Sequence, residues 1–83
     1  MSKKKVKYFI YLAKMESSHY DWYGTGDSKK SAVKNLIDFW DSDESSAIVT
    51  FEEYANDFNS SVQDFIEGNI HVKKVELNMG WQE

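Results

Sequence analysis

Residues 19–28 read HYDWYGTGDS, and this stretch decides the fold because it ends a strand and opens a helix. The period-two pattern of side chains over 19–23 is typical of a strand. Gly24 and Gly26 break that pattern. The side chain of Asp27 or Ser28 can then accept hydrogen bonds from the free amides of a helix that begins near residue 29.

The segment before this stretch predicts another strand, which pairs with 19–23 as a hairpin. Polar residues 15–18 supply the turn. Because a strand alternates its side chains between two faces, 5–13 divides into two sets. We expect the helices to cover the set that consists of Val6, Tyr8, Ile10 and Leu12. The other set should stay uncovered, and it consists of Lys5, Lys7, Phe9, Tyr11 and Ala13.

Two amphipathic helices follow in the sequence. The first begins at residue 29 and gathers its apolar side chains in one sector: Ala32, Val33, Leu36, Ile37, Phe39 and Trp40. Thr50 and Glu53 form a capping-box pattern, which predicts a second helix over 51–67. Gly68 is its expected C-cap, and the poor helix formers at 59–61 allow a kink.

A last strand is predicted over 70–79. Its apolar residues change from even to odd positions along the chain, and a bulge at Lys73 and Lys74 would bring them all to one face. Residues 47–50 could add a short strand. The order β-β-α-α-β predicts a small α+β domain, with a three-stranded antiparallel sheet and two helices packed on one face. We expect residues 1–83 to form this single domain, with 1–4 as a flexible basic N-terminus.

Composition narrows the class of protein. The chain has 83 residues, a net charge of −4 and no cysteine, which excludes disulfides and thiolate metal sites. No run approaches the roughly 20 apolar residues of a membrane helix, so we expect a cytoplasmic protein that does not contact membranes. The absence of arginine, proline and cysteine is typical of an A/T-rich genome, such as that of a low-GC bacterium or its phage.

Catalytic and metal-binding motifs are not met. Lys29 stands where both phosphate-loop fingerprints require glycine, so 24–31 fits a turn and helix cap better. His19 and His71 lack the spacing of metal ligands. His19 and Asp21 share one side of the predicted strand, but no nucleophile is placed beside them. We expect no enzyme activity, cofactor or metal.

The charge distribution is the most unusual feature of the sequence. Between Asn35 and Val72 there is no lysine or arginine, while nine carboxylates occur there. Eight of them define a predicted acidic surface, and it consists of Asp41, Asp43, Glu44, Glu52, Glu53, Asp57, Asp64 and Glu67. Such a surface can be simply solvated, or it can imitate a nucleic-acid backbone and engage a basic protein.

The alternative binding site is the uncovered face of the sheet. Phe9 and Tyr11, flanked by Lys5 and Lys7, would form an aromatic face that suits single-stranded nucleic acid or a homodimer. Of these two partners the homodimer fits better, because the whole domain is acidic and would repel the phosphates of a nucleic acid. Our leading hypothesis remains a non-enzymatic protein-binding module, such as a phage or mobile-element accessory or inhibitor protein.

A local resemblance adds a further alternative. Two strands followed by 26–28, Ala32 and 35–36 at the start of a helix resemble the strand-to-helix corner of HicB-type antitoxin domains. The resemblance covers about a quarter of the chain and implies an antitoxin-like domain. The Pro- and Gly-rich link typical of those domains is not present in this segment.

Overall fold

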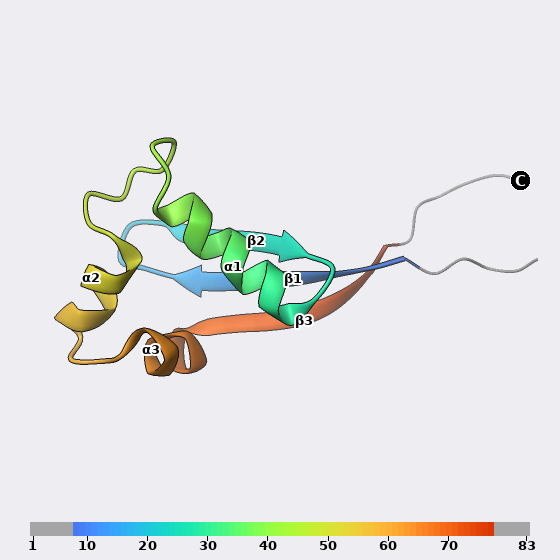
Figure 1. The fold of residues 1–83 in the computed structure, drawn as a ribbon. Helices are drawn as coiled ribbons and strands as arrows, with labels where there is room; N and C mark the ends of the chain where they lie inside the picture. Colours follow the sequence, from blue (N-terminus) through green and yellow to red (C-terminus); the bar gives the residue numbers. More distant parts are fainter. Residues whose placement is uncertain (1–7, 78–83) are drawn as a thin grey trace, which may run out of the picture.

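The computed structural model describes residues 8–77 of the chain. Three strands form an antiparallel sheet in the order β2-β1-β3; α1 lies along one face of it, while α2 and α3 gather at the end of the sheet where the β1–β2 turn lies, and all three helices contribute to one core (Figure 1). The predicted α+β fold is confirmed, except that the second helix is two helices. The elements are β1 (Tyr8–Glu16), β2 (Asp21–Gly26), α1 (Lys29–Trp40), α2 (Phe51–Asp57), α3 (Val62–Asn69) and β3 (Ile70–Leu77).

The face of β1 that packs against the helices is the opposite of the predicted one. Ala13 and Met15 are fully buried in the core, and Tyr11 packs against it. Since alternate residues share a face, Phe9 also lies on the helix side, while Ile10 and Leu12 lie on the uncovered side. Within residues 8–13 both sets consist of apolar or aromatic residues, so the alternation alone could not show which set faces the helices.

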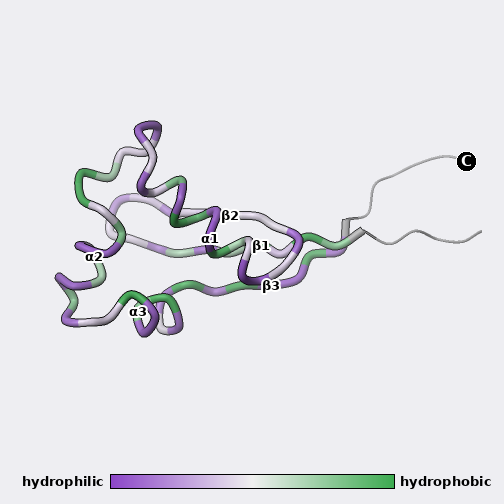
Figure 2. Tube along the Cα trace, in the orientation of Figure 1, coloured by the Kyte–Doolittle hydropathy of each residue, from purple (hydrophilic) through white to green (hydrophobic). Residues whose placement is uncertain are grey.

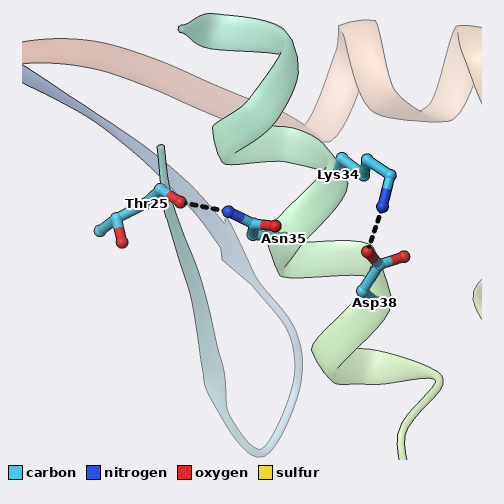
Figure 3. A network of polar contacts seen from close by, with 4 residues as sticks. All are labelled: Thr25, Lys34, Asn35 and Asp38. Atoms are coloured by element: carbon cyan, nitrogen blue, oxygen red, sulfur yellow. Dashed lines mark hydrogen bonds and ion pairs between the residues drawn. The ribbon is translucent and has the colours of Figure 1, made fainter. Parts of the chain in front are cut away.

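Small residues explain why this face is covered. Ala13 pairs with Gly24 on β2. A Cβ atom on Gly24 would clash with the backbone of Ala32 and Leu36, so α1 lies directly against β2 there. Asn35 ties the same two elements together, because its Nδ2 donates to the carbonyl oxygen of Thr25 at 2.6 Å (Figure 3).

Helix α1 begins where the sequence predicts. The Ser28 hydroxyl accepts from the amide of Ser31 at 3.1 Å and so caps the helix. In Figure 2 hydrophobic and hydrophilic residues alternate along the α1 trace, as expected for an amphipathic helix.

The predicted helix over 51–67 is broken at Asn59, whose φ of 57° is left-handed. Ser61 then caps α3 by accepting from the amide of Asp64. Gly68 is not a C-cap, because it lies inside α3 and β3 follows at once. Thr50 caps α2 as predicted, and its hydroxyl accepts from the amide of Glu53 at 3.2 Å.

Strand β3 has no bulge at Lys73 and Lys74. Its residues pair one to one with β1, from Tyr8 opposite Leu77 to Met15 opposite Ile70. The alternation slips because the apolar residues change faces: Val72 points toward the helices and Val75 toward the uncovered side. Residues 47–50 form no strand.

Aromatic side chains join the hairpin to all three helices. The ring centroids of Trp22 and Trp40 are 4.2 Å apart, and Trp40 contacts Phe51 edge-on at 5.8 Å. Phe51 contacts Phe65 of α3 at 5.7 Å. The indole nitrogen of Trp40 donates to the carbonyl oxygen of Val49 at 2.9 Å, which anchors the loop between α1 and α2. One continuous core therefore fixes the positions of α2, α3 and this loop.

Candidate functional site

The predicted acidic surface is built by the loop over 41–50, α2 and α3. In Figure 1 these segments gather around the end of the sheet where the β1–β2 turn lies. All eight carboxylate residues of the acidic surface are exposed. Their side chains point outward because the apolar residues of the same helices, Phe51, Ala55 and Phe65, fill the core.

Within residues 8–77 no lysine forms an ion pair with this acidic surface, although Glu67 lines a groove together with lysines of α1. The ion pairs there are Lys14 with Glu16 and Lys34 with Asp38, and none includes a member of the acidic surface. Asp41 has a structural role, since its Oδ1 accepts from the amide of Phe51 at 2.8 Å. Among the described residues the surface therefore has a single sign of charge without ion-pair partners.

Exposed apolar side chains accompany these carboxylates, and the sequence did not predict them as part of the site. Ile48 is 97% exposed, Phe58 is 61% exposed and Tyr20 is 58% exposed. Tyr54 connects them: it lines a shallow groove together with Tyr20 and Ile48, and its ring lies 5.2 Å from that of Phe58. We call these four residues the apolar strip.

Two members of the apolar strip, Ile48 and Phe58, lie beside carboxylates of the acidic surface. Asp43 and Ile48 line the same hollow of the 41–50 loop, and Asp57 immediately precedes Phe58. Phe58 leaves the core stripe because α2 ends at Asp57. A single helix over 51–67 would have turned Phe58 toward the core, so the periodicity of the sequence did not indicate its exposure. Ile48 offered a weaker signal, as an apolar residue in a segment without helical or strand pattern.

The alternative aromatic face is not formed as predicted. Tyr11 packs against the core, and Phe9 lies on the helix side with the Lys74 ammonium 4.0 Å from its ring centroid. Lys5 and Lys7 lie outside the described residues, as does the predicted flexible segment 1–4. Without Phe9 and Tyr11, the uncovered face lacks the paired aromatic platform that single-stranded nucleic acid was expected to use.

Tyr23 and Lys14 stand on that uncovered face instead. The Lys14 ammonium lies 5.9 Å from the Tyr23 ring centroid and 3.4 Å from a Glu16 carboxylate oxygen. Tyr23, together with Glu16 and Asp21, raises the pKa of Lys14 above its ordinary value. The lysine is thus held in its charged form by its neighbours, and the face is mixed in charge.

The two histidines are far from forming one centre. His19 lies in the β1–β2 turn and not in β2, whereas His71 pairs with Lys14 on the sheet. Among the described residues no group of three or more His, Asp or Glu side chains could hold a metal ion. In that same part of the chain, every buried side-chain nitrogen or oxygen has a hydrogen-bonding partner.

None of the helices described, α1 to α3, has the length and apolar character needed to cross a membrane.

No protein-family model, curated protein or solved structure matches this chain. The resemblance to HicB-type antitoxin domains therefore stays a prediction.

Proposed function

We propose that this chain is a non-enzymatic protein-binding module that engages a basic protein through the acidic surface and the apolar strip. The observation that carries the proposal is the position of Ile48, which is 97% exposed among carboxylates that form no ion pair with a described lysine. Exposed single apolar residues are common on soluble proteins. Three exposed apolar side chains that gather around the half-buried Tyr54, close to carboxylates, are more typical of an interface.

The two components would contribute differently to binding. Burial of a large apolar side chain contributes about 1.5–3 kcal/mol, so Ile48 and Phe58 would supply much of the affinity. The carboxylates would attract a basic partner over distance and fix its orientation, an effect that salt screens. The association rate with the partner is therefore expected to fall at high salt, while the contribution of apolar burial to the affinity remains.

Closely spaced carboxylates also suit a partner that normally binds nucleic acid, because they can imitate phosphates in its basic groove. An inhibitor from a phage or mobile element would act in this way. The apolar strip supports a protein target in particular, since nucleic-acid backbones offer no apolar counterpart to Ile48.

Affinity capture with the immobilised chain tests the proposal. Wild type is compared with Asp43→Lys/Asp57→Lys, with Ile48→Ser/Phe58→Ser, and with the charge-matched control Asp21→Lys/Asp27→Lys. The control residues are exposed but lie outside the acidic surface. We expect both site variants to lose a basic protein that the wild type and the control retain. Equal capture by all four forms, at low salt, would exclude this surface as the binding site.

A further inference from the structure

A second groove, separate from the apolar strip, lies between α1 and α3. Its volume is about 710 Å³ and it is open to solvent. Val33, Ile37 and Ile66 supply its apolar lining, and all three are half-buried against the core. The groove therefore offers preformed apolar surface outside the site proposed above.

One rim of this groove is basic. Lys29, Lys30 and Lys34 line it from α1, while Gln63 and Glu67 line it from α3. Lys34 is paired with Asp38 at 2.6 Å, as Figure 3 shows. Neither Lys29 nor Lys30 forms an ion pair within residues 8–77. Two lysine charges are thus available at one end of the groove.

The positions of these two lysines are unfavourable for the helix itself. They begin α1, whose first turn contains no acidic residue. The amino end of a helix carries partial positive charge, so lysines there are unfavourable where a carboxylate would stabilise the helix. An incoming anionic group would relieve this repulsion and interact favourably with both lysines and the helix end.

We propose that the α1–α3 groove binds an amphipathic helix of a partner protein, with acidic side chains of that helix facing Lys29 and Lys30. The lining residues of α1 run from 29 to 38, which is about 14 Å, or two to three helical turns. A groove between two helices accepts a third helix by interlocking of side-chain rows. This surface goes beyond the proposed function, because it selects the opposite sign of charge.

The chain would then have two binding surfaces, which meet at Glu67. The acidic surface and the apolar strip would hold a basic protein, and the groove would hold an acidic helix. The carboxylates of Asp38 and Glu67 also line the groove, so they would disfavour acidic residues on the other flank and give the bound helix one orientation.

Two designed peptides test the groove. Both are amphipathic 14-residue helices with the same leucine stripe, and one has glutamate flanks whereas the other has lysine flanks. Titration into the full chain is followed by NMR of the methyl groups of Val33, Ile37 and Ile66. We expect these methyl signals to shift with the acidic peptide and not with the basic one.

Reversing the charge of the two rim lysines then tests whether they bind the acidic side chains of the peptide. Lys29→Glu/Lys30→Glu should weaken binding of the acidic peptide at least about 10-fold. This variant places carboxylates at the amino end of α1, which favours the helix, so unfolding would not explain a loss. Lys14→Glu/Lys73→Glu changes the net charge equally on the uncovered sheet face and should leave binding unchanged.

Three results would overturn the proposal: equal binding of both peptides, shifts confined to Ile48 instead of the groove, or groove shifts that appear on concentrating the chain without peptide. The last would identify a second copy as the occupant. Because capture through the apolar strip is measured with different variants, failure of the groove and failure of the proposed function remain distinguishable.

Discussion

At the scale of single residues, two glycines differ in whether the fold has room for a larger side chain. Gly24 provides the space that α1 needs against β2, whereas Gly68 lies inside α3, and a Cβ atom there would meet no atom within 4 Å apart from its chain neighbours and the backbone of its own helix. Glycine is required at the first position by contact and is only a cost at the second, because it lowers helix propensity.

We predict that Gly24→Ala destabilises the chain by roughly 2–3 kcal/mol, since the added methyl group meets backbone atoms of Ala32 and Leu36 that cannot move without shifting α1. Urea denaturation followed by circular dichroism measures the change. Wild-type stability in this variant would show that α1 does not sit against β2 at Gly24.

The matched substitution Gly68→Ala should do the reverse. We predict a gain of about 0.5–1 kcal/mol, because alanine is the better helix former and the site is open. The same denaturation assay applies. A loss of stability would indicate that Gly68 ends α3, which was the prediction from sequence.

At the scale of secondary-structure elements, the break between α2 and α3 depends on Asn59. Its left-handed backbone turns the chain, and Ser61 then caps the next helix. Asparagine tolerates this conformation better than most residues, and glycine tolerates it fully.

Asn59→Ala is therefore expected to cost about 1–2 kcal/mol, whereas Asn59→Gly should remain close to wild type. Thermal unfolding of the two variants side by side provides the measurement. If alanine and glycine behaved alike, the left-handed turn would not be what separates the helices.

Most elements could be predicted from local patterns, and the errors share one cause. Ser28 and Thr50 could be predicted as helix starts, because an N-cap side chain bonds to an amide only two or three residues further along the chain. The inward face of β1 depends on contacts with Gly24 and Val72, which are distant in sequence. The poor helix formers at 59–61 indicated a kink at this place, but the full break at Asn59 depends on how α2 and α3 pack against the same core.

The candidate site was predictable only in part for the same reason. Its carboxylates could be found by counting charge, because charged residues stay exposed almost wherever the fold puts them. The exposure of Ile48 and Phe58 depends on where the core ends, so it required the three-dimensional structure.

At the scale of the whole molecule, charge is sorted unevenly, with the acidic surface at the end formed by the 41–50 loop, α2 and α3. Carboxylates there repel one another, and none of them forms an ion pair with a lysine among residues 8–77. Stability is consequently reduced at low ionic strength, where such repulsion is least screened.

We predict that the melting temperature rises by a few degrees when salt increases from about 0.01 M to 0.15 M, a range over which the Debye length falls from about 30 to 8 Å. Sodium chloride is used, since it screens charge without strongly strengthening apolar burial. Asp43→Lys/Asp57→Lys should show a smaller rise. A melting temperature that falls with salt would contradict a self-repelling surface.

The close packing of Trp22 against Trp40 has a practical consequence. Two indoles with ring centroids 4.2 Å apart, one on the hairpin and one at the end of α1, are near enough for their electronic transitions to couple. That coupling gives the native chain its own optical signature, which disappears as soon as the hairpin and α1 separate. Folding and ligand-induced rearrangement can thus be followed without any added dye.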